Sequence, residues 1–368
     1  MLRNQSISAL LLYQMIILCT GISNHVLLSP VLLQVAKRDS WVAALLSLIP
    51  AIAFTCLLYW TLRRTGQANI IDWLQQRFGT TIQLLVSVLA SLYFLYISFY
   101  TIKDMTVWTS VSYLPNTPIS AITLAFILLC FFAAKAGIRP IAITAGILLP
   151  FVIIFGLFVG ITNLQFKHYP LLLPILTHGY GPTLHAALLS CGGLFEIVFI
   201  LYMRHHVSTV IRLPALLFVL LILGSLTLGV LTGSISIFGP FAAADLRYPA
   251  FEQWRLVTIG KYISHLDFLS IYQWISGAFI RVSLMLFLIP ELLRARTERE
   301  RTIILLLFSV LLFGFSLFPL SDLTFFNQLK SWYFPVSLGM ALLLTLLPLG
   351  LSWLPDKRKE NRTHVKKT

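Results

Sequence analysis

A carboxylate and two adjacent glycines stand together in the middle of a long apolar segment of this sequence. The stretch SCGGLFE at 190–196 contains Gly192, Gly193 and Glu196. A charged side chain at membrane depth is costly and usually lines a pathway or site, and backbone without helical hydrogen bonds must face protein or water. We therefore expect an interrupted helix beside a polar site. The alternative is a close-packed glycine seam, with Glu196 paired to a neighbouring helix.

A second charge, Arg281, lies near the middle of another apolar segment, FLSIYQWISGAFIRVSLMLFLIP. An arginine buried in a membrane requires a carboxylate partner or a pathway. Glu196 is the first candidate partner, and Asp267 is the alternative. We therefore expect Glu196 and Arg281 to form a charge network.

The first apolar segment contains a glycine with polar neighbours: Gly21 is followed by Ser23, Asn24 and His25. This pattern indicates either a second helix break or a packing glycine whose polar neighbours approach the membrane interface. The first and sixth apolar segments are five apart, and they would be equivalent in a five-plus-five inverted repeat. Interruptions at equivalent positions of two halves indicate a transporter-type binding site.

The composition indicates that these segments lie in a membrane. The chain of 368 residues is 58% hydrophobic and 11% charged, with a mean hydropathy of +0.87. A membrane-spanning helix needs about 20 mostly apolar residues, so most of the chain can lie in a bilayer. The net charge of +14 could suggest nucleic acid as a partner. The positive residues instead lie in short loops and the C-terminal tail, which is typical of topology determinants and contacts with anionic membrane lipids.

The sequence predicts an all-α polytopic membrane protein with one transmembrane domain, 1–354, and a basic cytoplasmic tail, 355–368. The ten predicted spans are 8–29, 41–61, 82–103, 119–134, 139–161, 183–203, 213–235, 267–289, 303–320 and 332–354.

Most Lys and Arg residues fall in the even-numbered loops and the tail, so the positive-inside rule predicts cytoplasmic N- and C-termini. Residues 163–182 are then an external loop, which we expect to be ordered against the bundle. Residues 236–266 are also external and mix apolar and polar residues at helical spacing from 250 to 263, which predicts either an amphipathic helix or a plain surface connection. A further amphipathic helix is predicted in NIIDWLQQRFG, on the cytoplasmic face. We expect Lys103 and Asp104 to reach water from the outer end of the third span.

Catalytic and cofactor-binding patterns are absent from the sequence. There is no H-E-x-x-H, G-x-x-x-x-G-K-[ST] or G-x-S-x-G, which disfavours a membrane enzyme. The four cysteines lie singly in apolar segments, so neither disulfides nor a zinc site is predicted. His205 and His206 are adjacent beside Arg204 at a span end. We interpret them as interfacial, with metal binding as the weaker alternative, and we expect no cofactor and no metal.

The order of several motifs resembles the B subunit of spore germination receptors, the endospore germination permease family of the amino acid–polyamine–organocation superfamily. The resemblance covers nearly the whole chain. It is carried by a glycine-interrupted first span, Asp39 and Trp41 in D-x-W, YPLLLPIL before the sixth span, GLFE within it, YPAFEQWRLVTIGKYISHLD, and Trp274 to Gly277 in W-I-x-G.

The resemblance implies a LeuT-like five-plus-five inverted repeat with broken helices 1 and 6. It also implies a germinant such as an amino acid, bound between these helices, and a complex with A and C subunits in the spore inner membrane. The third and eighth spans contribute residues only by analogy of fold. The implied substrate-binding residues are Gly21, Ile22, Ser23, Tyr96, Gly192, Gly193, Glu196 and Tyr272. The alternative function is an active amino acid or cation permease with the same site.

Overall fold

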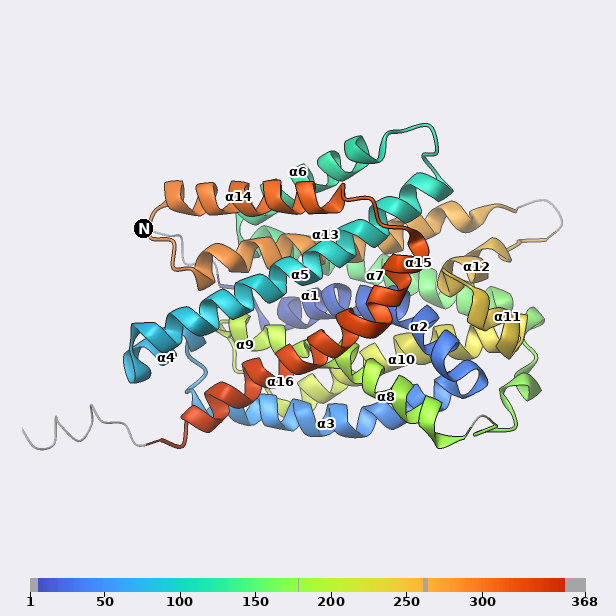
Figure 1. The fold of residues 1–368 in the computed structure, drawn as a ribbon, viewed down its shortest axis with the longest axis horizontal. Helices are drawn as coiled ribbons and strands as arrows, with labels where there is room; N and C mark the ends of the chain where they lie inside the picture. Colours follow the sequence, from blue (N-terminus) through green and yellow to red (C-terminus); the bar gives the residue numbers. More distant parts are fainter. Residues whose placement is uncertain (1–5, 178, 261–263, 355–368) are drawn as a thin grey trace, which may run out of the picture.

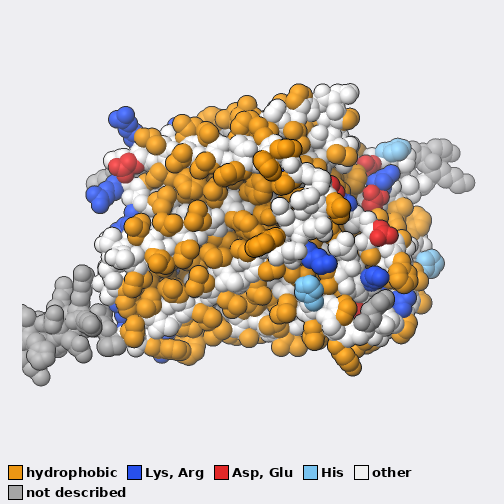
Figure 2. Space-filling model, viewed as in Figure 1, with side chains coloured by type: hydrophobic (Ala, Val, Ile, Leu, Met, Phe, Trp, Pro, Cys, Tyr) orange, Lys and Arg blue, Asp and Glu red, His pale blue; other side chains and the backbone are white. Residues whose placement is uncertain are grey.

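The computed structural model describes residues 6–177, 179–260 and 264–354, and in these ranges the chain is a bundle of long helices. Most of the helices run along one direction and lie side by side (Figure 1). Hydrophobic side chains cover much of the visible face between the two ends of the bundle, and charged side chains gather toward those ends (Figure 2). This distribution is that of a multi-pass membrane protein, because helices satisfy their own backbone hydrogen bonds in lipid.

The spans are formed by the following helices. Span 1 contains α1 (Ala9–Ile22), η1 (Ser23–Leu27) and α2 (Leu28–Ala36), and spans 2 to 5 are α3 (Ser40–Arg64), α5 (Thr80–Ser112), α6 (Ile119–Ala136) and α7 (Ile138–Thr162). Span 6 contains α8 (Tyr180–Leu194), η5 (Phe195–Val198) and α9 (Phe199–Met203), and spans 7 to 9 are α10 (Leu213–Phe238), α13 (Leu269–Leu292) and α14 (Glu298–Ser316). Span 10 contains α15 (Asp322–Gln328), η8 (Leu329–Tyr333) and α16 (Phe334–Leu351).

Eight stretches of the described chain are long and apolar enough to cross a membrane by themselves. The first of them, Ala9–Arg64, contains two spans, because a 3-10 turn at Lys37–Asp39 separates α2 from α3. Helix α14, span 9, is missing from these stretches because its first turn is charged, but it packs against α6 and α13 like the other spans. The described ranges therefore contain the ten spans that the sequence predicts.

Three predicted boundaries differ clearly from the structure, and the first is the end of span 3, which lies at Ser112 rather than at residue 103. Span 1 continues to Ala36 rather than ending at residue 29, because the helix passes through Pro30 after a π-helical turn at Ser23–Leu27. Local π-helical adjustments are one way in which membrane helices tolerate proline. Span 10 begins at Asp322 rather than 332, with Ser321 capping its first turn through the backbone N–H of Thr324.

The two ends of the bundle carry different short elements. The amphipathic helix α4 (Ile70–Phe78) lies at one end, which we call the α4 face, together with both ends of the described chain (Figure 1). Helices α11 (Pro240–Asp245) and α12 (Pro249–Arg255) lie at the opposite end, which we call the α11 face. The location of both chain ends at one face agrees with an even number of spans.

The loops at the α11 face are ordered where the structure describes them. The backbone N–H of His168 donates to Ser236 O at 2.8 Å, and that of Leu176 donates to Asp39 Oδ1 at 2.7 Å. Helix α12 ends at Arg255 and so is shorter than the predicted stretch to residue 263, of which residues 261–263 lie outside the described ranges. Gly260 has a φ of +61°, which an α-helix cannot continue.

Candidate binding site at the centre of the bundle

Spans 1 and 6 change their helical type shortly after the predicted glycines. In span 1 the α-helix becomes a π-helical turn at Ser23, two residues after Gly21. In span 6 it becomes a 3-10 turn at Phe195, two residues after Gly193. The interruptions are therefore local changes of hydrogen-bonding pattern, and no unwound segment separates the described halves of either span. Such changes shift the register of the residues that follow and often mark functional positions.

The side chain of Asn24 connects the two interruptions. Its Nδ2 donates to the carbonyl of Thr20 at 3.0 Å and to the carbonyl of Gly193 at 3.2 Å. Thr227 in span 7 donates to the carbonyl of Asn24 at 3.2 Å. Backbone groups released by the changes of helical type thus find partners inside the protein, as a membrane interior requires.

Glu196 and Arg281 form a two-bonded ion pair at the centre of the bundle. Arg281 Nη1 donates to Glu196 Oε2 at 2.7 Å, and Nη2 donates to Oε1 at 2.8 Å. Both side chains are 0% exposed. Glu196 lies in the 3-10 turn of span 6, and Arg281 lies in the middle of span 8. Two parallel N–H···O bonds of this kind fix geometry as well as adding attraction.

Three further side chains complete the central network. The hydroxyl of Tyr333 accepts from Arg281 Nη2 at 2.7 Å and donates to Glu196 Oε1 at 3.0 Å. Arg281 Nε donates to Thr101 Oγ1 at 3.0 Å, and Nη1 donates to the carbonyl of Cys19 at 2.8 Å. Ser23 Oγ lies 3.5 Å from Glu196 Oε1. These hydrogen bonds offset part of the cost of removing two charges from water, and they join spans 1, 3, 6, 8 and 10.

The structure places the remaining predicted site residues at different distances from this network. The Tyr96 ring stacks on the Tyr333 ring with centroids 5.8 Å apart. Ile22 packs against Gly277 of span 8, on the border of the network. Tyr272 instead contacts Phe151 and Phe155 of span 5, so its ring is not brought together with Glu196 or Arg281.

The glycines of spans 1 and 6 lie in close helix contacts. A Cβ atom on Gly192 would stand 2.3 Å from the backbone oxygen of Phe334 in span 10, and one on Gly193 would stand 2.6 Å from Asn24 Oδ1. A Cβ on Gly21 would meet Leu226 at 3.2 Å. Small residues here allow spans 1, 6, 7 and 10 to approach one another, which is the packing role of glycine in membranes.

Tyr333, Thr101 and Cys19 were not identified from the sequence as members of the network. The predicted start of span 10 at residue 332 puts Tyr333 at the membrane edge, whereas the helix starts at Asp322 and carries Tyr333 deep into the bundle. Ser321, an N-cap residue, followed by Asp322 in the first turn is a helix-start signal that would have moved the boundary.

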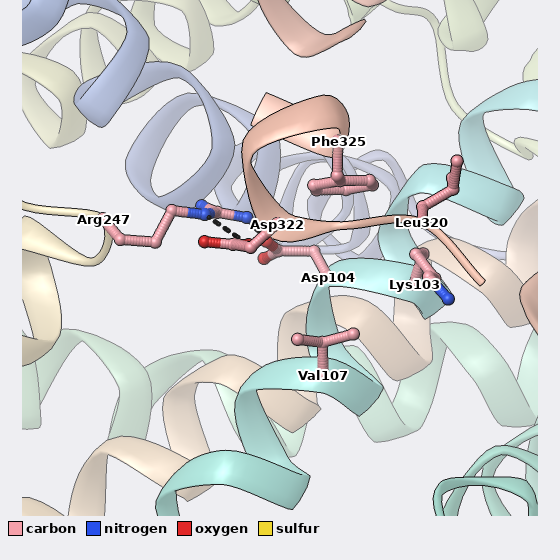
Figure 3. A pocket seen from close by; sticks show the side chains of 7 residues that line it. All are labelled: Lys103, Asp104, Val107, Arg247, Leu320, Asp322 and Phe325. Carbon is pink, nitrogen blue, oxygen red and sulfur yellow. Dashed lines mark hydrogen bonds and ion pairs between the residues drawn. The ribbon is translucent and has the colours of Figure 1, made fainter. Parts of the chain in front are cut away.

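A second charged cluster closes the α11 face. Arg247, which precedes α12, extends between two carboxylates: Nη2 donates to Asp104 at 2.8 Å and Nε donates to Asp322 at 3.0 Å (Figure 3). The Asp104 side chain is 2% exposed. Burial by itself would lower the pKa of Arg247. The electrostatic effects of Asp104, Tyr248 and Asp322 outweigh burial and raise the pKa of Arg247 above its usual value. The cluster ties a loop of the α11 face to spans 3 and 10.

Lys103 and Asp104 do not reach water as predicted. The ammonium of Lys103 donates to the carbonyls of Ser316 and Phe318 at 3.0 and 2.9 Å, and its side chain is directed away from Arg247 (Figure 3). Each of the adjacent charges has its own partner, and Lys103 and Asp104 are 6% and 2% exposed, because spans 9 and 10 and the loop of Arg247 enclose this part of span 3. The prediction that they extend to solvent was therefore wrong.

The family model and the related sequences all point to spore germination proteins, and a solved structure identifies the fold. A family model described as "Spore germination protein" matches residues 6–322. Spore germination protein XB of Bacillus anthracis is 38% identical over 341 residues, which cover 92% of this chain and 96% of that protein. Putative spore germination protein YfkT of Bacillus subtilis is 24% identical over 266 residues, which cover 71% of this chain and 72% of that protein.

Among solved structures, the crystal structure of MhsT in complex with L-phenylalanine is similar with a TM-score of 0.64. The match covers 96% of this chain and 94% of MhsT, at 14% sequence identity. MhsT has the LeuT fold, so the ten spans of the present structure have the LeuT-like arrangement of two five-helix halves.

Proposed function

This chain belongs to the spore germination protein family, and from that membership we propose that it is a transporter-like sensor that binds a small amino-acid-type germinant and triggers spore germination. The family is a permease family, and no catalytic role is part of the proposal. In this function the chain is the B subunit of a receptor with A and C subunits in the spore inner membrane. The ligand is small, and surrounding lipids rather than nucleic acid contact the surface.

The Glu196–Arg281 pair is the observation that carries the proposal. It presents one negative and one positive group, fully buried, at the changes of helical type in spans 1 and 6. An amino acid carries the complementary carboxylate and ammonium. The germinant carboxylate takes a place on the Arg281 guanidinium, and its ammonium is bound by Glu196. A ligand with only one charge leaves one buried protein charge without a partner, which costs about 3–5 kcal/mol.

The surroundings of the pair supply the rest of the proposed site. Ser23 of span 1 and Tyr333 of span 10 contact Glu196, and the Tyr96 ring of span 3 stacks on Tyr333. The proposed site also includes Gly21, Ile22, Gly192 and Gly193, which lie close by along spans 1 and 6. The ligand bound to MhsT, L-phenylalanine, belongs to the proposed chemical class. Insertion between Glu196 and Arg281 separates spans 6 and 8, and partner subunits detect that movement.

Germination assays with chemically blocked germinants test this function. Spores that depend on this chain should respond to a free amino acid, whereas its carboxamide and its N-acetyl form should each be at least tenfold less potent. Each derivative has only one charge and so leaves one buried protein charge without a partner, at the cost of about 3–5 kcal/mol given above, and 1.4 kcal/mol corresponds to a tenfold change. The measurement is the germinant concentration for half-maximal response.

A strain without the gene and a strain with the gene restored are the controls for that assay. Equal potency of the free and blocked forms would contradict ligand binding by the ion pair. A response that does not change when the gene is deleted would contradict the sensor function itself.

The second candidate function is an active amino acid or cation permease, which the LeuT-like fold favours. The site is the same, but the ligand is released on the opposite side of the membrane. Uptake of a radiolabelled germinant into proteoliposomes that contain the purified chain distinguishes the two functions. Accumulation above protein-free vesicles favours the permease, and saturable binding without accumulation favours the sensor.

The proposed orientation places the α4 face and both termini in the cytoplasm. A cysteine at Arg255, whose side chain is 60% exposed, should react with an impermeant maleimide added outside. A cysteine at Arg299, in the exposed first turn of α14, should react only after permeabilisation. The background lacks the native cysteines, including the exposed Cys56. Reversed labelling would invert the topology, because the distribution of positive charge is what supports it.

A further inference from the structure

Two histidines and a glutamate converge at the α4 face, where spans 6 and 8 end. His205 and His206 form most of the 3-10 turn Arg204–His206 that follows α9, and Glu291 lies in the last turn of α13. Glu291 Oε2 lies 2.8 Å from His206 Nε2 and 3.5 Å from His205 Nε2. One ligand atom from each of the three residues can be chosen so that all lie within 4.8 Å of one another.

From this convergence the geometry points to a binding site for a divalent transition-metal ion, with zinc as the best fit. Two imidazole nitrogens and one carboxylate oxygen are zinc ligands, at about 2.0–2.2 Å from the metal. Tetrahedral bonds of that length put ligand atoms roughly 3.3–3.5 Å apart. The 3.5 Å separation already fits, and the 2.8 Å separation must widen by about half an ångström.

The surroundings of the three residues suit a bound ion. Their side chains are 15–23% exposed, so they are partly shielded but accessible from the α4 face. A small pocket lined by His205, Glu291 and Asn69 leads to them. Three protein ligands leave a fourth position for water, as in open zinc sites.

The neighbouring arginines leave the Oε2 atom of Glu291 free to bind a metal ion. Arg301 Nη1 lies 4.0 Å from Glu291 Oε1, on the oxygen that does not face the histidines. The Arg204 guanidinium is engaged elsewhere, with Gln67 Oε1 and the carbonyl of Val207 at 2.6 Å each. The metal takes the place of the proton between His206 and Glu291, and each neutral imidazole then carries its proton on Nδ1. The positive charge of Arg301 reduces the affinity but holds the carboxylate in place.

A metal at this position would join spans 6 and 8 for a second time. Glu196 and Arg281 connect the same two spans in the middle of the bundle, and His205, His206 and Glu291 connect them at the α4 face. Occupancy would therefore oppose separation of these spans at their α4-face ends. The inference itself concerns the site and does not depend on the germinant.

Titration of the purified full-length chain in nanodiscs with Zn²⁺, and with Co²⁺ as a coloured probe, tests the site. We expect saturable binding of one ion per chain, reversed by EDTA, with the visible absorption of four-coordinate Co²⁺. His205→Gln, His206→Gln and Glu291→Gln should each weaken binding at least tenfold. Glu291→Gln retains the size of the side chain and one acceptor oxygen while removing the charge, which makes it the sharpest of the three.

The matched control is His168→Gln, which replaces an exposed histidine at the α11 face and should leave binding unchanged. X-ray absorption of the Zn²⁺-loaded wild-type protein, which requires no variant, should show two imidazole nitrogens in the first coordination sphere. Binding that is not saturable at one ion per chain, or that His168→Gln weakens as much as Glu291→Gln does, would overturn the proposal. Absence of imidazole in the absorption spectrum would overturn it as well.

Discussion

Replacing Glu196 with glutamine, or Arg281 with methionine, is expected to remove most of the folded protein from the membrane. Either change leaves the other charge buried without a counter-ion, which destabilises a protein by about 3–5 kcal/mol. That amount is a large fraction of the about 5–15 kcal/mol by which folded proteins are stable. Both side chains are 0% exposed, so water cannot replace the lost partner. The measurements are membrane abundance and thermal unfolding in detergent.

The double variant Glu196→Gln with Arg281→Met separates coupling from independent effects. It removes both charges together, so its abundance should exceed that of either single variant. The matched control is Glu252→Gln, which breaks an exposed pair with Arg255 and should cost about 0–1 kcal/mol. Losses in the double variant that equal the sum of the two single losses would contradict the coupling of the pair.

Gly192→Ala is expected to reduce the amount of folded protein severely. The new Cβ would stand 2.3 Å from the backbone oxygen of Phe334, and a backbone atom in the middle of span 10 cannot move aside without displacing the helix. Small-to-large changes in well-packed interiors cost about 1–3 kcal/mol and occasionally more. Membrane abundance after expression is the direct measurement.

Gly160→Ala and Gly314→Ala are the controls for this prediction. Neither new Cβ would meet an atom within 4 Å, and both positions are helical, so abundance should be unchanged or slightly higher. Gly193→Ala is intermediate, since the clash is with the Asn24 amide, which can move but then loses its bond to Gly193 O. Wild-type abundance of Gly192→Ala would show that the seam between spans 6 and 10 is looser than the structure indicates.

The spans and the central charges follow from the sequence for simple physical reasons. Long apolar runs must become helices in a bilayer. Glu196 and Arg281 are among very few charges in the middle of such runs, so each is the natural partner of the other. That argument required neither the register of the helices nor their order around the bundle.

Other parts of the site depend on three-dimensional arrangement that periodicity does not encode. Tyr333 reaches the network because span 10 starts ten residues earlier than its apolar run suggests. Tyr96 and Tyr272 were chosen by analogy of fold, and a rotation of span 8 decides that Tyr272 faces span 5. The partner of Asp104 lies in the loop before α12, far along the chain, and local sequence carries no signal for that contact.

The adjacent residues Lys103 and Asp104 have a further electrostatic consequence. Ser316 is the last residue of α14, and its carbonyl and that of Phe318 lie at the negative end of the helix dipole. The Lys103 side chain, which belongs to span 3, therefore caps the C-terminal end of span 9 with its positive charge. Its charge is compensated by the helix end, while Asp104 is compensated by Arg247. Sliding span 3 past span 9 would therefore separate the ammonium from both carbonyl groups and remove the cap from the end of span 9.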